Sequence, residues 1–118
     1  MIDERVEELP IFEFDNENIT ISGKSIPYDA RSVWGIFVKQ MDFYIQKRTS
    51  ITLNFKLDIF NSSSSLFLTE IFEILTNNRH KITPCIKWYY YEADEHMQEL
   101  GEIYKELYTK IEFHLIER

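Results

Sequence analysis

The chain has 118 residues, of which 44% are hydrophobic, so it can form one compact core but is too short for two ordinary domains. Its formal charge is −7, from 13 Lys and Arg against 20 Asp and Glu, which disfavours binding to nucleic acid or to anionic lipid. We therefore expect a single domain, residues 1–118, that binds a protein partner or a small ligand.

The first nine residues are acidic and lack the apolar core of a secretory signal. No segment approaches the roughly 20 apolar residues that a membrane-spanning helix needs. We expect residues 1–9 to form a flexible or peripheral N-terminus, and the protein to be cytoplasmic and not bound to a membrane.

The first half of the chain predicts two short strands and a helix. Residues 11–14 and 19–21 flank the polar cluster 15–18, which is typical of an antiparallel hairpin, and residues 22–25 end it. Beyond Pro27, apolar residues recur at spacings of three and four and predict a helix over residues 29–47. Its apolar stripe consists of Val33, Trp34, Phe37, Met41, Tyr44 and Ile45.

A second strand–helix pair follows. Residues 51–59 alternate strictly, which predicts a strand with one core face and one less apolar face. The expected core residues are Ile51, Leu53, Phe55, Leu57 and Ile59. After a run of four serines, apolar residues at helical spacing predict a helix that ends within residues 76–79.

The last third predicts a strand, a helix and a final strand. The strand, residues 82–91, contains four successive aromatic residues, and we expect Trp88 and Tyr90 in the core, with Tyr89 and Tyr91 at an edge or a partner-binding surface. Asp94 is the expected N-cap of the helix, and residues 111–115 form the last strand. The apolar face of that helix consists of Met97, Leu100, Tyr104, Leu107 and Tyr108.

The element order is therefore ββαβαβαβ. Helical crossovers imply largely parallel strands, so we predict an α/β domain with a mixed, mostly parallel sheet of about five strands and three helices. In open sheets of this kind, sites gather beyond the carboxyl ends of the strands. The serine run lies at such an end.

Two interpretations of the serine run remain open. Asn61 or Ser62 can be a simple N-cap of the following helix, a role that these residue types often fill. The helix N-terminus also stabilises an anion or a phosphorylated side chain, which makes the run a candidate regulatory phosphosite.

Patterns for other chemistry are weak. Three isolated glycines cannot form a phosphate-binding loop, and no G-x-S-x-G motif supports a hydrolase. Three dispersed histidines (His80, His96 and His114) lack a metal-ligand spacing, and the single Cys85 excludes a disulfide and a cysteine-built metal site. The acidic residues between Glu92 and Glu102 are explained by a solvated helix face. We therefore expect no catalytic residues, no metal and no cofactor.

Three motifs together resemble the SiaC family of bacterial regulatory phosphoproteins over residues 10–113. They are Gly23-Lys24-Ser25-Ile26-Pro27, Asn61-Ser62-Ser63-Ser64 and the segment from Trp88-Tyr89-Tyr90 to Gly101-Glu102. The resemblance implies a fold and a regulatory logic like those of anti-sigma-factor antagonists, without catalysis.

The resemblance also implies a partner switch. A kinase phosphorylates, and a phosphatase dephosphorylates, the hydroxyl just after the Asn of the motif, which is Ser62 here. The unmodified form binds an effector, in the best-described systems a diguanylate cyclase that it activates, which controls cyclic di-GMP and biofilm growth. The sequence departs from the family pattern in having Ser62 for Thr, Leu66 for Lys and Tyr28 for Glu.

The partner-binding surface expected from these arguments lies around the serine run and the loop before the first helix. It comprises Asn61, Ser63, Ser64, Ser65, Pro27, Tyr28 and Asp29. The alternative hypotheses are a sensor that binds an anionic metabolite at the same helix N-terminus and at residues 88–91, and an enzyme that uses Ser62 or the acidic residues.

Overall fold

The structure is a computed structural model that describes residues 7–118, and it contains eight elements. In chain order they are β1 (Ile11–Asp15), β2 (Asn18–Ser25), α1 (Ala30–Lys47), β3 (Ser50–Phe60), α2 (Ser62–Asn77), β4 (Thr83–Tyr90), α3 (Glu95–Leu107) and β5 (Glu112–Glu117). The predicted order ββαβαβαβ is confirmed. None of the three helices in the described residues combines the length and the apolar character needed to cross a bilayer.

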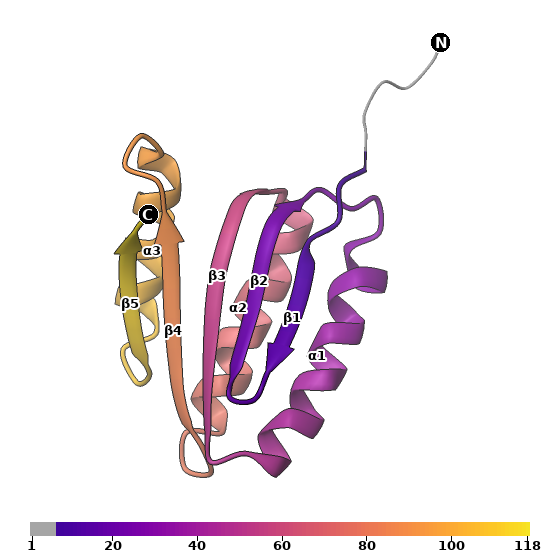
Figure 1. Ribbon diagram of the computed structural model, residues 1–118, viewed down its shortest axis with the longest axis vertical. Coiled ribbons are helices and arrows are strands. Elements are labelled where there is room, and N and C mark those ends of the chain that lie inside the picture. The colour runs from indigo at the N-terminus through magenta and orange to yellow at the C-terminus, as the bar shows by residue number, and fades with distance from the viewer. Residues whose placement is uncertain (1–6) are drawn as a thin grey trace.

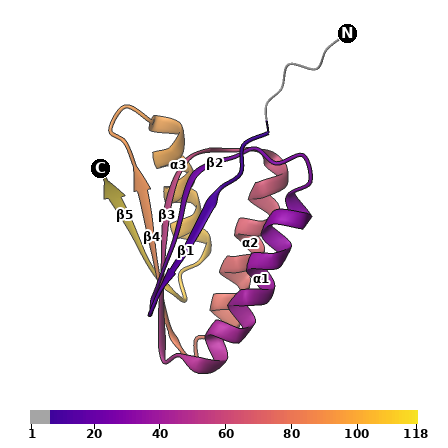
Figure 2. The same ribbon diagram turned by 45° about the vertical axis from the view of Figure 1, so that its right-hand side comes forward.

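The five strands form one mixed sheet in the order β1-β2-β3-β4-β5 (Figure 1). β1 pairs with β2 in antiparallel fashion, and the other neighbours are parallel. Each helical crossover therefore steps to the next strand in the same direction. Right-handed crossovers that all step one way place their helices on one face of the sheet, and Figure 2 shows α1, α2 and α3 together on that face. Within residues 7–118, the opposite face carries no helix.

The core fills the space between the sheet and the helices. Phe72 of α2 is central: its ring centroid lies 5.6 Å from that of Phe55 and 5.1 Å from that of Tyr104. Trp88 of β4 lies 5.4 Å from Tyr104, so rings from β3, α2, β4 and α3 form one cluster. The burial of Trp88 and the partial burial of Tyr90 against the core confirm the predicted inward face of β4.

A second aromatic group joins α1 to the hairpin. The Phe12 ring of β1 stacks on Phe37 at 4.6 Å and meets the edge of Trp34 at 5.2 Å. The predicted apolar stripe of α1 therefore faces the sheet. Its buried members are Trp34, Phe37, Met41 and Ile45, with Val33 and Tyr44 partly buried.

The strict alternation predicted for residues 51–59 is wrong at Ile59, which is exposed. The pairing of β2 with β3 shifts between Gly23 and Lys24, which pair with Leu57 and Ile59, so Asp58 is an extra residue on β3. Such a bulge reverses the faces of the residues that follow it, and Phe60 packs against the core instead.

Two other details differ from prediction. β2 runs on to Ser25 because Gly23, with φ of 85°, adopts a backbone that lets the strand pass the bulge. Leu107 is exposed because α3 ends at that residue. Of the predicted peripheral N-terminus, residues 1–6 lie outside the described residues, while Glu8 pairs with Ile26 through two backbone hydrogen bonds.

Candidate functional site

Two loops meet at the carboxyl end of the sheet, at the upper edge in Figure 1. One joins β2 to α1, and the other joins β3 to α2. The backbone N–H of Asn61 donates to the carbonyl oxygen of Ser25 over 3.0 Å, and its side-chain Nδ2 donates to the carbonyl oxygen of Pro27 over 3.3 Å. The structure thus places Pro27 beside the serine run. We call residues 61–65 the serine loop.

Asn61 is the N-cap of α2, so one of the two predicted caps is found. Its Oδ1 accepts hydrogen bonds from the backbone N–H of Ser64 over 3.0 Å and from the Ser64 hydroxyl over 2.8 Å. A cap satisfies one of the backbone donors that a helix leaves unpaired at its start. Asn61 therefore fixes both the start of α2 and its contact with the neighbouring loop.

A buried chain of hydrogen bonds lies beneath the loop. Trp34 Nε1 of α1 donates to the Ser25 hydroxyl over 3.0 Å, and the hydroxyls of Ser25 and Ser64 lie 2.8 Å apart. The Ser64 hydroxyl in turn donates to Asn61 Oδ1. Each side chain can therefore donate to the next one, from Trp34 through the two serines to Asn61. Ser25 and Ser64 are both 0% exposed. This chain locks the serine loop onto β2 and α1.

The other three serines face outwards to different degrees. Ser62, the first residue of α2, and Ser63 are exposed, and neither hydroxyl hydrogen-bonds within the described residues. Ser65 is partly buried, and its hydroxyl donates to the carbonyl oxygen of Ser62 over 2.6 Å. The run thus divides into a buried structural hydroxyl, Ser64, and two accessible ones.

Tyr28 and Asp29 lie at the start of α1. Tyr28 is 66% exposed. Asp29 is the N-cap of α1, where its carboxylate accepts hydrogen bonds from the hydroxyl and the backbone N–H of Ser32. These two hydrogen bonds hold the pKa of Asp29 below its ordinary value of 3.8. Its charge is therefore committed to the helix cap.

The first turn of α2 carries no charged side chain of its own. The first turn of α2 has no acidic residue, and residues 62–66 contain no Lys or Arg, so the positive end of the helix dipole is not offset there. Arg31 of α1 lies over the Phe67 ring of α2, 5.6 Å from its centroid. Leu66, one turn beyond Ser62, is 70% exposed.

The four successive aromatic residues, 88–91, differ in their access to solvent. Trp88 is 1% exposed, and its Nε1 donates to the carbonyl oxygen of Met97 over 2.9 Å. Tyr89 and Tyr91 stack against Lys56 and Arg118, at 4.9 and 4.2 Å. The metabolite-sensor hypothesis therefore loses Trp88 as a binding residue.

Sequence reasoning missed Ser25 and Trp34 as parts of the site. Their hydroxyl and indole N–H meet only because β2 pairs with β3 and α1 packs behind them. A signal was present, since Ser25 ends a strand beside the Pro27 loop. Nothing in the spacing of Ser25 and Ser64, 39 residues apart, indicated that they touch.

A family model described as SiaC family regulatory phosphoprotein matches residues 8–118. The search of curated proteins finds no match.

Three solved structures share the fold. One is a chain of the crystal structure of the diguanylate cyclase SiaD in complex with its activator SiaC from Pseudomonas aeruginosa, with 18% identity, a TM-score of 0.86, and coverage of 97% of this chain and 96% of that one. The others are SiaC of Pseudomonas aeruginosa (16% identity, TM-score 0.79, coverage 100% and 98%) and apo-SiaC from Pseudomonas aeruginosa (16% identity, TM-score 0.77, coverage 100% and 97%).

Proposed function

The chain belongs to the SiaC family of regulatory phosphoproteins, and we propose that it is a non-enzymatic signalling protein switched by reversible phosphorylation of Ser62. The observation that carries this proposal is the contrast within the serine loop. Ser62 presents a free, exposed hydroxyl at the first position of α2, whereas Ser64 is buried and hydrogen-bonded. A kinase can reach Ser62 without opening the loop.

A modulating role without catalysis fits the surroundings of Ser62. A serine nucleophile needs a neighbouring base that removes its proton. No such base hydrogen-bonds to the Ser62 hydroxyl within the described residues. We therefore infer that the Ser62 hydroxyl accepts a phosphate from a kinase and does not act as a catalytic nucleophile.

Phosphorylation of Ser62 would change the surface locally. The phosphate adds a charge of about −1.5 to −2. Residues four apart share one face of a helix, so the phosphate of Ser62 would lie beside the exposed side chain of Leu66. A partner that buries Leu66 would also have to desolvate that phosphate, which costs several kcal/mol without a paired cation. The unmodified form is therefore the one that binds.

The proposed partners are a protein kinase and a phosphatase that act on Ser62, and an effector protein that covers the serine loop. Exposed Ser63 and Tyr28 extend this surface, while Asn61, Ser64 and Asp29 hold it in place. A diguanylate cyclase is the effector class that we propose, because SiaC of Pseudomonas aeruginosa is described as the activator of one. The proposal places the protein in the cytoplasm, where ATP for the kinase and GTP for such a cyclase are available.

The test compares the modified and unmodified protein. The chain is incubated with ATP and each Ser/Thr kinase-like protein of its own genome, and tryptic peptides are read by mass spectrometry. We expect a single phosphate on Ser62, absent in Ser62→Ala and retained in Ser63→Ala.

Binding to diguanylate cyclases of the same genome is then measured with Ser62→Ala and Ser62→Asp. We expect Ser62→Ala to bind one cyclase and raise its output of cyclic di-GMP, and Ser62→Asp to weaken binding at least tenfold. Ser63→Asp is the matched control for added charge. Phosphorylation elsewhere, or equal binding by the Ala and Asp variants, would contradict the proposal.

A further inference from the structure

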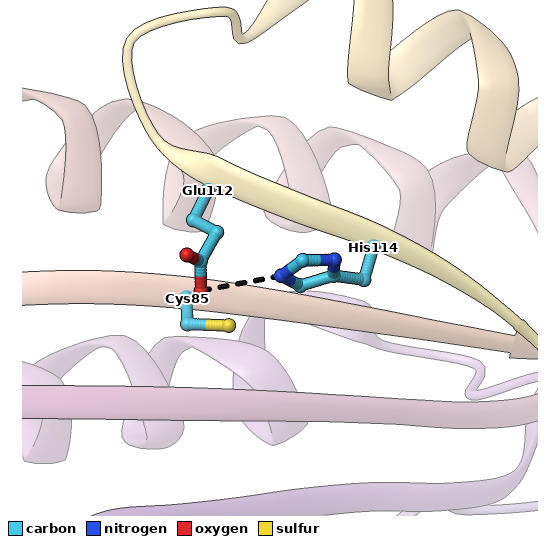
Figure 3. A group of neighbouring side chains, drawn as sticks. All are labelled: Cys85, Glu112 and His114. Carbon is cyan, nitrogen blue, oxygen red and sulfur yellow. Dashed lines mark ion pairs between the residues drawn. The ribbon is translucent and has the colours of Figure 1, made fainter.

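Three side chains of metal-ligating types meet on the face of the sheet that none of the described helices covers. Cys85 comes from β4, and Glu112 and His114 come from β5. Each residue offers one ligand atom, and the three atoms lie within 4.8 Å of one another. They are the thiol sulfur, a carboxylate oxygen and an imidazole nitrogen. Figure 3 shows the carboxylate of Glu112 and the imidazole of His114 between the two strands, joined by an ion pair, with the side chain of Cys85 next to the carboxylate on β4.

Strand register creates this group. Cys85 is the direct partner of Glu112 in the parallel pairing of β4 with β5. His114 follows Glu112 by two residues and so points to the same face of the sheet. Because the pairing crosses 27 positions of sequence, no local spacing of His and Cys reveals the group.

The donor set suits zinc. A sulfur, a nitrogen and an oxygen donor are the three ligand types that Zn²⁺ takes in proteins, with bonds of about 2.0 to 2.3 Å. Tetrahedral bonds of that length place the ligand atoms about 3.3 to 3.6 Å apart. His114 Nε2 and Glu112 Oε2 are already 3.2 Å apart. All three ligand atoms lie within 4.8 Å of one another, so any wider separation must shorten by about 1 Å for the ion to bind.

We propose that Cys85, Glu112 and His114 form a zinc-binding site on the open face of the sheet, with water at the fourth position. The site is separate from the serine loop and does not depend on the phosphorylation of Ser62. Glu112 and His114 are exposed and Cys85 is partly buried, which gives the ion access from solvent while the thiol is shielded on one side.

Two features oppose or compete with the ion. Desolvation, and secondarily the hydrogen bond to Glu112 and its charge, raise the pKa of the Cys85 thiol to about 11, so the ion must displace a proton. Lys87 is the register partner of His114, and its positive charge acts on both Cys85 and Glu112. We expect Lys87→Gln to strengthen zinc binding a few-fold by removing that charge.

The consequence for the fold is a cross-link at the edge of the sheet. Among the described strands, β5 lies at the edge of the sheet and pairs only with β4. An ion held by both strands binds only the folded state, so it adds stability. At a hundredfold excess of Zn²⁺ over its dissociation constant we expect the melting temperature to rise by roughly 5 to 10 °C.

The experiment uses the untagged full-length chain after removal of metal by a chelator. Co²⁺ is titrated first, because a thiolate bound to Co²⁺ gives a charge-transfer absorption band, and this chain has one cysteine. We expect a 1:1 band that Zn²⁺ abolishes by displacement. Cys85→Ser should lose the band, and His114→Gln and Glu112→Gln should each weaken binding at least about tenfold.

Controls separate this site from casual binding by other side chains. His96→Gln and His80→Gln remove imidazoles elsewhere and should leave the titration unchanged. Because His114 and Glu112 are exposed, their variants should fold, which circular dichroism verifies. Absence of the band, or equal Zn²⁺ affinity in the wild-type chain and His114→Gln, would overturn the proposal.

Discussion

Ser62 and Ser64 lie two residues apart in the serine loop, yet their hydroxyls have opposite surroundings. The Ser64 hydroxyl is enclosed and hydrogen-bonds to Asn61 and to the Ser25 hydroxyl. The Ser62 hydroxyl faces solvent. Substitution by alanine at the two positions should therefore have different consequences for stability and for signalling.

We predict that Ser64→Ala lowers the free energy of unfolding by about 1 to 3 kcal/mol, because it leaves the buried Ser25 hydroxyl with one partner fewer. Ser62→Ala should change it by less than about 0.5 kcal/mol, as is usual for exposed positions. Urea unfolding followed by circular dichroism measures both. Equal effects of the two substitutions would contradict the buried hydrogen-bond chain.

Asn61 allows a second test at this scale. Asn61→Ala removes the cap of α2 and the hydrogen bond to Pro27, and we expect a loss of about 1 to 2 kcal/mol. Asn61→Asp keeps the acceptor for Ser64 but not the donor to Pro27, so it should retain most of the stability. If the two variants unfold at the same urea concentration, the cap is not what holds the loop.

The cap of α1 should appear in the pH dependence of stability. Hydrogen bonds from Ser32 lower the pKa of Asp29 in the folded state, so below about pH 4 the unfolded chain binds more protons than the folded one. The ionised carboxylate of Asp29 therefore contributes to the free energy of unfolding above its ordinary pKa of 3.8. This contribution is lost as the pH falls through the lower pKa that Asp29 has in the folded state. Asp29→Asn, which still caps the helix, should flatten the loss of stability between pH 4 and pH 2, measured by urea unfolding at each pH.

At the scale of elements, two helical glycines offer a matched comparison. A Cβ at Gly101 of α3 would lie 2.5 Å from Trp88 Cδ1 and 2.5 Å from Leu115 Cδ2, so α3 approaches β4 and β5 closely only because that residue has no side chain. At Gly35 of α1 the nearest atom would be Arg31 Cγ at 3.8 Å, an ordinary contact.

We predict that Gly101→Ala destabilises the protein by about 1 to 3 kcal/mol through overpacking. Gly35→Ala should stabilise it by up to about 1 kcal/mol, because alanine favours the helix more than glycine. Thermal and urea unfolding of the two single variants decide this. Stabilisation by both substitutions would mean that α3 can shift away from the sheet at little cost.

Local patterns predicted most of the elements, because amphipathic helices and half-buried strands have distinct periods. The N-cap Asp94 was also predicted, since capping depends on residues only three apart. Asp29, which was predicted as the first residue of its helix, is the N-cap of that helix instead. The failures share one cause. The bulge that exposes Ile59 and the contact between Ser25 and Ser64 both depend on how β2 pairs with β3, which periodicity within one segment does not specify.

The whole molecule is a two-layer structure, which is unusual for parallel strands, since most parallel sheets are covered on both faces. The alternation in β3 already indicated this, because a strand covered on both faces is apolar throughout. Thr52, Asn54 and Lys56 occupy the uncovered side, where Asn54 is buried and its Nδ2 donates to Asn18 Oδ1 over 3.4 Å. Polar side chains there let the open face remain in water.

The proposed phosphorylation of Ser62 should act without changing the fold. An acidic group at the first position of α2 meets the positive end of the helix dipole, and that turn has no acidic residue of its own. We therefore predict that Ser62→Asp raises the free energy of unfolding by roughly 0.3 to 1 kcal/mol at low ionic strength, and less in high salt. Urea unfolding at two salt concentrations measures this. A clear loss of stability would mean that the negative charge acts by loosening the loop.

The hydrogen bond between Ser25 and Ser64 also determines at which stage of folding the loop that presents Ser62 is formed. The two hydroxyls come from segments 39 residues apart, so a nascent or unfolded copy cannot present the loop as the finished protein does. A short synthetic peptide spanning the serines would lack it as well. A kinase that recognises the folded loop, and not its linear sequence, would thus modify only chains that have completed folding. The phosphate would then also mark the folded state.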